Sequence, residues 1–221
     1  MLTERLSVLF DQVGAEWVLW LLLALAVISI ALAIERILFL WQHQVPVATL
    51  QTELLAALDH GQADALKVLS RYKGMEAVVA AAGVREMHRG AEAVAEVMAA
   101  TMATEKKRYE KYLIFLSSLG ANAPFIGLLG TVIGILGAFA ALKQQVGAGG
   151  SRQALIMGSI SEALVATAVG LFVAIPSVVA YNTFRTRVKR ATTDTEALSA
   201  MVLAHLHTVT HNKANPVERK G

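Results

Sequence analysis

A single carboxylate stands in an otherwise uncharged stretch of the sequence. Glu162 is the only Asp, Glu, Lys, Arg or His residue between Gln153 and Phe184. An isolated carboxylate in hydrocarbon costs about 3 kcal/mol on insertion scales, so such a residue usually has a function. One interpretation is a protonatable group that lines a polar pathway. The other is a carboxylate at the outer membrane interface, because residues 163–184 alone are long enough to cross a bilayer. The residues themselves leave both interpretations open.

Two threonines could accompany this carboxylate. Thr167 follows Glu162 by five residues, and Thr131 lies in the preceding apolar run. Hydroxyl groups can solvate a carboxylate or hold a chain of water molecules. Threonine also bonds to carbonyl groups of its own helix, so each threonine has a structural interpretation as well.

Other chemistry is poorly represented in this chain. It contains no cysteine, which removes disulfides, thiolate metal sites and cysteine nucleophiles. His205, His207 and His211 form a His-x-His-x3-His cluster, but no nearby carboxylate completes a metal site. The motifs His-Glu-x-x-His and Gly-x-Ser-x-Gly are absent. We therefore expect a protein that is not an enzyme and that carries no metal and no other cofactor.

The elements that must position these residues are membrane-spanning helices. The chain has 221 residues, of which 55% are hydrophobic and 17% charged, a composition too apolar for an ordinary soluble domain. Three apolar runs predict an all-α fold with transmembrane helices at 17–41, 112–142 and 154–184. A cleaved signal peptide is the alternative for the first run. The acidic residues Glu4, Asp11 and Glu16 before it favour a retained helix.

Basic residues beside the runs predict the orientation of the chain. They gather before the second run and after the third, at Lys106, Lys107, Arg108, Lys111, Arg185, Arg187, Lys189 and Arg190. The positive-inside rule then places residues 42–111 and 185–221 in the cytoplasm, and the N-terminal stretch 1–16 and the loop 143–153 outside. The net charge of +3 therefore indicates topology, and we expect no nucleic-acid partner.

The two cytoplasmic segments have apolar residues at helical spacing. Gly61 separates two predicted short helices, and the pattern from Met75 to Lys111 contains no proline. This predicts one long helix that runs into the second span. The third span is expected to extend similarly until Asn215 and Pro216 end it. No strand pattern appears, so we expect a cytoplasmic helical bundle.

A stripe of glycines marks the second span. Gly127, Gly130, Gly134 and Gly137 follow one another at steps of three, four and three residues, which places them on one side of a helix. Thr131 lies on the same side, about 40° from Gly127. Small residues let membrane helices approach closely. The stripe predicts either contact between subunits or packing within the chain's own hairpin.

Two long stretches resemble the signatures of the ExbB/TolQ branch of the MotA/TolQ/ExbB proton channel family. Residues 123–135 read APFIGLLGTVIGI, and residues 161–171 read SEALVATAVGL, continued by AIPSVVAYN at 174–182. Their order and spacing match the second and third spans of that family. Ile133 stands where the family frequently has tryptophan, a departure that affects packing more than proton chemistry.

The resemblance implies a function for these residues. It implies a bacterial inner-membrane protein, with its outer side in the periplasm, that forms a ring of five subunits. Spans two and three would line a pore around single-span ExbD/TolR-like partners. Proton flow would then drive movement that a TonB/TolA-like protein transmits to the outer membrane. By position, Glu162 matches the family's pore glutamate, and Thr131 and Thr167 match its pore threonines.

Three spans favour ExbB-like or TolQ-like chains over MotA-like chains, which have four. We prefer an ExbB-like subunit of TonB-dependent uptake, with a TolQ-like envelope-maintenance or gliding-type motor subunit as the alternative. A non-conducting membrane scaffold, in which the glycine stripe only assembles a complex, is the alternative from another functional class.

Overall fold

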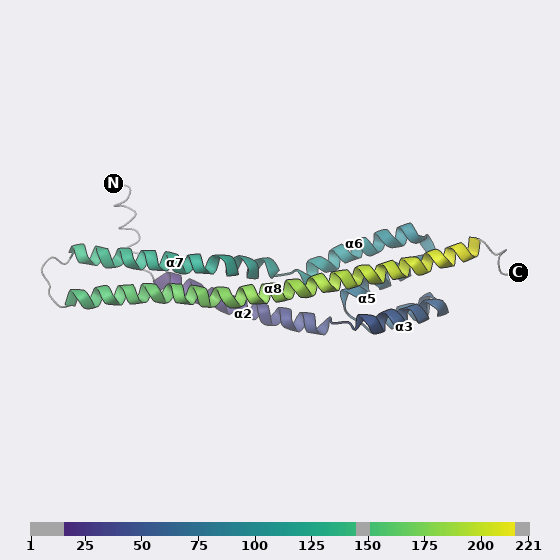
Figure 1. Cartoon of the computed structure of the whole chain (residues 1–221), viewed down its shortest axis with the longest axis horizontal. Coiled ribbons are helices and arrows are strands. Elements are labelled where there is room, and N and C mark those ends of the chain that lie inside the picture. The colour runs from purple at the N-terminus through teal and green to yellow at the C-terminus, as the bar shows by residue number, and fades with distance from the viewer. Residues whose placement is uncertain (1–15, 145–150, 215–221) are drawn as a thin grey trace. The chain divides into compact units, whose positions relative to one another are not determined.

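The computed structural model describes residues 16–144 and 151–214, with side chains at 16–139 and 157–209. These residues are all-helical and contain no strand. In chain order the elements are α2 (Glu16–Gln42), α3 (Val47–His60), α4 (Gln62–Leu69), α5 (Met75–Arg85), the 3-10 helix η1 (Met87–Arg89), α6 (Ala91–Tyr109), α7 (Leu113–Gln144) and α8 (Ser151–Ala214) (Figure 1). Helices α2, α7 and α8 are each long and apolar enough to cross a membrane. The predicted all-helical fold with three apolar spans is confirmed.

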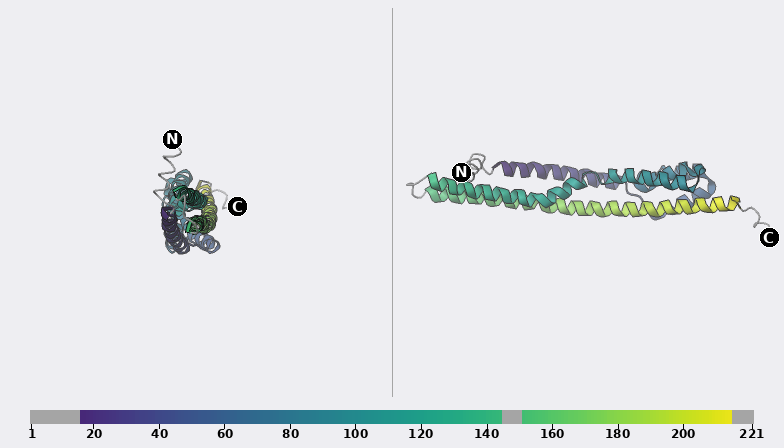
Figure 2. Two further views of the ribbon diagram at one scale, coloured as in Figure 1. Left: turned by 90° about the vertical axis from the view of Figure 1, so that its left-hand side faces the viewer. Right: turned by 90° about the horizontal axis from the view of Figure 1, so that it is seen from above.

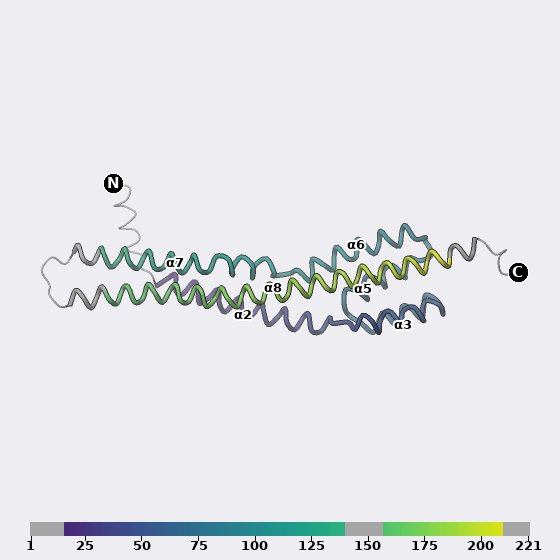
Figure 3. Tube along the Cα trace, viewed as in Figure 1, coloured from purple at the N-terminus to yellow at the C-terminus, as the bar shows by residue number. Residues whose placement is uncertain are grey.

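The chain divides into two compact units. The apolar unit comprises Met1–Glu35 and Tyr112–Thr183, and the polar unit comprises Arg36–Lys111 and Phe184–Gly221. Helix α8, labelled in the Cα trace of Figure 3, contributes residues to both units. The predicted N-terminal stretch, the glycine turn and the stop at Pro216 lie outside the described residues.

The apolar unit is built around the pair formed by α7 and the first part of α8. The two helices run side by side in both orientations of the ribbon, and α2 packs against them (Figure 2). Their shared core consists of Val18, Leu22, Leu119, Ala123, Ile133, Val173 and Ala174. The other face of α2 exposes large apolar side chains, among them Trp20, Val27 and Ile30. Such a face is suited to contact lipid.

The polar unit contains the short helices and the second part of α8. Its buried apolar residues include Leu50, Leu54, Leu69, Met75, Val79, Val94, Leu198 and Val202. The predicted helix pair around Gly61 is confirmed, because α3 and α4 are separated by this residue alone, which has a φ of 126°. A positive φ of this kind is readily adopted by glycine.

The predicted single helix from Met75 into the second span is wrong. Helices α5 and α6 are separated by η1 and by Gly90, which has a φ of 94°, and α6 and α7 are separated at Tyr112, which has a φ of 67°. A left-handed residue cannot continue a right-handed helix. Apolar spacing persists across both breaks because each helix still buries one face. The predicted extension of the third span is confirmed, because α8 continues to Ala214.

Candidate functional site

Glycines bring the backbones of α7 and α8 into direct contact. A Cβ atom at Gly127 would lie 2.8 Å from the carbonyl oxygen of Ala166 and 3.0 Å from the Cα of Thr167. A Cβ atom at Gly170 would lie 2.7 Å from the carbonyl oxygen of Ala123. No side chain fits between the helices at this level. The absence of Cβ atoms is therefore what allows the helices to approach so closely.

Of the other three glycines in the stripe, two contact α8 within the described chain and one does not. A Cβ atom at Gly130 would lie 2.7 Å from the Cβ of Ala166, and one at Gly134 would lie 2.7 Å from the Cβ of Ala163. Gly137, in contrast, has no atom of the described chain within 4 Å of its Cβ position. Three of the four glycines thus contact the chain's own helix, as the hairpin interpretation requires. Gly137 has no contact of this kind.

Glu162 points away from this helix contact. Ala163 and Ala166 face α7, whereas Glu162 is exposed. Successive helical residues are about 100° apart, so Glu162 lies to one side of the α7-facing surface. No hydrogen bond or ion pair reaches its carboxylate within the described part of the chain. The chain alone supplies no group that compensates a charge at this position.

The two threonines differ in their surroundings. The Thr131 side chain is buried, and its hydroxyl donates to the carbonyl oxygen of Leu128 at 2.7 Å. The Thr167 hydroxyl oxygen is also buried but has no hydrogen-bond partner among the described residues. The structure therefore places Thr167 beside Gly127 through its backbone, but no hydrogen bond joins Thr131, Thr167 and Glu162 within the part it describes.

A buried serine pair links α2 to α8. The Ser29 and Ser177 hydroxyl oxygens are 2.9 Å apart, and Ser177 also donates to the carbonyl oxygen of Val173 at 2.8 Å. Sequence reasoning did not find this contact. A serine directly after Pro176 in an apolar run was the only available signal.

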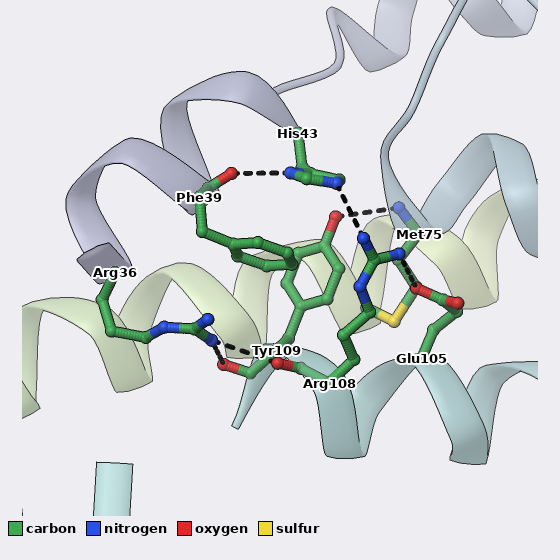
Figure 4. A network of polar contacts seen from close by, with 7 residues as sticks. All are labelled: Arg36, Phe39, His43, Met75, Glu105, Arg108 and Tyr109. Atoms are coloured by element: carbon green, nitrogen blue, oxygen red, sulfur yellow. Dashed lines mark hydrogen bonds and ion pairs between the residues drawn. The ribbon is translucent and has the colours of Figure 1, made fainter. Parts of the chain in front are cut away.

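The polar unit contains a buried polar network that the sequence also did not predict (Figure 4). The Arg36 guanidinium donates to the carbonyl oxygens of Arg108 at 3.1 Å and Tyr109 at 3.5 Å, and it lies 4.5 Å from the centre of the Phe39 ring. The Tyr109 hydroxyl accepts a hydrogen bond from the Met75 backbone N–H at 3.0 Å. Burial raises the pKa of Tyr109 to about 12, so this hydroxyl stays protonated at neutral pH.

Glu76 is the second notable carboxylate. Its side chain is 4% exposed and lines a cavity together with Asp194 and five other polar residues of the polar unit. Burial raises the pKa of Glu76 to about 7, a hydrogen bond from its own backbone N–H opposes this rise, and Asp194 adds to it. This carboxyl therefore titrates near neutral pH.

The histidine cluster does not assemble in the described structure. The Nδ1 atom of His205 lies 3.9 Å from a carboxylate oxygen of Asp59, and His207 is exposed. The side chain of His211 lies outside the described residues. Within the described chain, no group of three or more His, Cys, Asp or Glu side chains is arranged to hold a metal ion.

Comparison with known proteins gives consistent matches. The sequence model of the MotA/TolQ/ExbB proton channel family matches residues 71–197. The chain is 46% identical over 99 residues to the biopolymer transport protein ExbB of Neisseria gonorrhoeae, which covers 45% of this chain and 44% of that protein. It is 43% identical over 98 residues to the Tol-Pal system protein TolQ of Pseudomonas aeruginosa, which covers 43% of this chain and 40% of that protein.

The family match includes all of the candidate residues in α7 and α8. The aligned part spans less than half of each curated relative's length. The family match covers more than half of this chain, from just after α4 through the apolar hairpin to residue 197 of α8. The chain belongs to the MotA/TolQ/ExbB proton channel family.

Proposed function

We propose that this chain is a subunit of an inner-membrane proton channel that uses the proton motive force to drive a partner protein. The observation that carries the proposal is the position of Glu162. It is the only Asp, Glu, Lys, Arg or His residue in the apolar part of α8, within the family match, and it points away from its own helix pair. Ionisable residues at such places mark ion or proton pathways.

The exposed carboxylate supports assembly with other chains. A charge in an apolar segment needs a polar partner, and the described chain supplies none to Glu162. We propose a pentamer in which α7 and α8 line a pore, with Glu162, Thr131 and Thr167 along the proton pathway. A single-span ExbD/TolR-like partner inside the pore would supply a second titratable group. The unpartnered Thr167 hydroxyl could then bond to water or to that partner.

The energy available is sufficient for such a motor. One elementary charge that crosses about 100 mV releases about 2.3 kcal/mol. Several protons could therefore rearrange a helix interface. A TonB/TolA-like protein would transmit this movement to the outer membrane. The proposed orientation places the N-terminus in the periplasm and residues 42–111 and 185–221 in the cytoplasm.

Replacement of Glu162 tests the proton pathway. We expect Glu162→Gln to abolish proton flux into liposomes that contain the chain with its partner, because glutamine cannot bind and release a proton. Assembly, measured as the mass of the purified complex, should be unchanged. Glu92→Gln, which removes an exposed carboxylate of α6, is the matched control and should keep its flux.

The scaffold alternative gives the opposite result. A complex that only assembles through the glycine stripe should energise its partner equally well with glutamine at position 162. Unchanged function of Glu162→Gln in cells would therefore reject the proposed proton pathway.

Within the family, we propose an ExbB-like role in TonB-dependent uptake. TolQ-like envelope maintenance or a gliding-type motor is the alternative, since curated relatives of both the ExbB and the TolQ kind match. Expression in bacteria that lack either ExbB or TolQ would separate the two. Restored uptake supports the first assignment, and restored envelope integrity supports the second. The neighbouring genes provide an independent test.

A further inference from the structure

The polar unit contains a cavity whose titratable groups have no part in the proposed proton channel. Its volume is about 250 Å³. Its lining comes from the end of α2 and the residues after it, and from α5, α6 and α8. The polar lining residues are His43, Gln44, Glu76, Tyr109, Arg187, Arg190 and Asp194. Helices from four parts of the chain therefore meet around one space.

Glu76 is the buried carboxylate of this cavity. One of its oxygens, Oε2, is inaccessible to solvent and has no hydrogen-bond partner among the described residues. The carboxylate does accept a hydrogen bond from the Glu76 backbone N–H. An ionised carboxylate is strongly destabilised when its oxygens are buried without donors, whereas a neutral carboxyl is much less so.

The chain packs closely around this carboxylate. A Cβ atom at Gly74 would lie 2.6 Å from Oε2 of Glu76 and 2.8 Å from the carbonyl oxygen of His43, and it would also collide with Val45. The connection between α2 and α3 thus lies against the start of α5, with the carboxylate beside it. Access of water to Oε2 therefore requires these segments to move apart.

The charged groups around the cavity do not neutralise Glu76. Asp194 approaches from α8 and repels a second negative charge. The arginines of α8, Arg187 and Arg190, line the same cavity but are exposed, and neither is paired with Glu76. His43, directly after α2, lies with Nδ1 at 2.7 Å from the Phe39 carbonyl oxygen, and its Nε2 faces Arg108 at 3.5 Å.

The remaining neighbours come from α6. The Tyr109 hydroxyl already accepts the Met75 N–H, and Glu105 is paired with Arg108 at 3.5 Å. Neither side chain places a positive charge beside Glu76.

We propose that Glu76 is a proton-binding site of the polar unit, whose neutral form holds α5 against the α2–α3 connection and α8, and whose ionised form loosens this contact. The ligand is the proton itself. The proposal does not depend on the role of Glu162, since the groups that carry it all lie in the polar unit.

The titration range makes the site responsive near neutral pH. The pKa of Glu76 is about 7 in the folded chain, above the ordinary value of 4.5. The folded state therefore binds more protons than the unfolded state between these two values. By linkage, the stability of the polar unit falls as the pH rises from about 4.5 to about 7 and then becomes constant.

Hydrogen exchange of α5 in the full-length chain tests this proposal. The exchange rates of wild type and Glu76→Gln should be compared at each pH, so that the intrinsic pH dependence of exchange cancels. The ratio of the wild-type exchange rate to the Glu76→Gln exchange rate should be on the order of 10-fold larger at about pH 8 than at about pH 5.5. Glu92→Gln, an exposed carboxylate of the same unit, should give a ratio that does not change with pH. A constant ratio for Glu76→Gln would overturn the proposal.

Infrared spectroscopy provides a readout that does not require the glutamine variant to fold. A neutral carboxyl C=O band of the wild type should disappear with a midpoint near 7, and Asp194→Asn should move that midpoint to lower pH by removing a repulsive charge. The absence of such a band, or a midpoint that Asp194→Asn leaves in place, would contradict the proposal. Neither measurement needs a proton gradient, and Glu162→Gln should behave as wild type in both. Failure of the Glu76 proposal would therefore not contradict the proposed proton channel, and failure of the proton channel proposal would not contradict the role of Glu76.

Discussion

The two units of this chain hold their helices together in different ways. In the apolar unit, α7 meets α8 through glycines whose missing side chains let backbone atoms touch, as between Gly127 and Ala166. The polar unit instead buries side chains that carry charge or hydrogen-bonding groups, among them Arg36, Glu76 and Tyr109. In lipid there is no hydrophobic effect between apolar helices, so close packing has to hold them together. In the polar unit, the hydrophobic effect in water drives the burial of side chains.

Glu162 in the apolar unit and Glu76 in the polar unit differ in the same way as the two units do. Glu162 points out of the apolar unit and has no hydrogen bond or ion pair within the described chain, whereas Glu76 points into the polar unit. In the proposed pentamer, another chain would supply the polar partner of Glu162. The surroundings that shift the pKa of Glu76 belong entirely to its own chain.

The largest effect is expected from Gly127→Val in the apolar unit. The first atom of the new side chain would collide with the Ala166 carbonyl oxygen and the Thr167 Cα, and backbone atoms cannot rotate away. Overpacking of this kind costs about 1–3 kcal/mol and occasionally more, and here we expect the upper end. The measurement is the yield of monodisperse protein together with its unfolding in detergent.

Gly137→Val is the matched control for this change, since its Cβ position has open space within the described chain. It should leave the folding of the single chain near wild type. Equal instability of both variants would mean that backbone contact between α7 and α8 is not what holds the apolar unit together.

A second large effect is expected from Arg36→Ala in the polar unit. This change removes a buried guanidinium and leaves the carbonyl groups of Arg108 and Tyr109 at the end of α6 without their donor. Hydrogen bonds from charged groups contribute about 1.5–3 kcal/mol each, so we expect a loss of about 2–3 kcal/mol. Chemical unfolding monitored in the polar unit measures it. Arg85→Ala, at an exposed arginine, should have almost no effect, and comparable losses in both variants would refute the importance of the buried network.

The sequence predicted what depends on local pattern. Long apolar runs and the glycine at position 61 correctly predicted three apolar helices and the α3–α4 pair. The breaks at Gly90 and Tyr112 were missed, because apolar spacing shows which residues face a core but not whether the helix changes direction between them. Gly90 was the only available signal for the first break. Tyr112 gave none, since tyrosine seldom adopts a positive φ.

The buried polar residues could not be predicted for a different reason. Arg36 and Glu76 belong to residue types that are mostly exposed, and their burial depends on contacts with residues far along the chain. Glu162 could be recognised because its run contains no other charge. The direction of the Glu162 side chain relative to α7 could be determined only from the contacts that Ala163 makes in the packed hairpin.

A moderate effect is expected from Tyr109→Phe. The variant keeps the ring and loses the hydroxyl that accepts the Met75 N–H at the start of α5, so a buried donor is left unpaired. A cost of about 1–2 kcal/mol follows. Hydrogen exchange at the Met75 amide should accelerate by about 5- to 30-fold. Tyr72→Phe is the control, since no hydrogen bond to the Tyr72 hydroxyl occurs in the described residues. An unchanged Met75 amide in Tyr109→Phe would show that this bond does not fix the start of α5.

The smallest effect is expected at the serine pair, where the apolar unit most resembles the polar one. Ser177→Ala removes the 2.9 Å contact with Ser29 and the bond to Val173, but it leaves the alanine and glycine packing of α8 unchanged. Side-chain hydrogen bonds between membrane helices contribute about 0.6 kcal/mol on average. We therefore expect a loss of that order, measured by unfolding in detergent as a cycle with Ser29→Ala and the double variant. A coupling energy above about 2 kcal/mol would show that buried polar contacts, rather than close backbone packing, hold α2 against the α7–α8 hairpin.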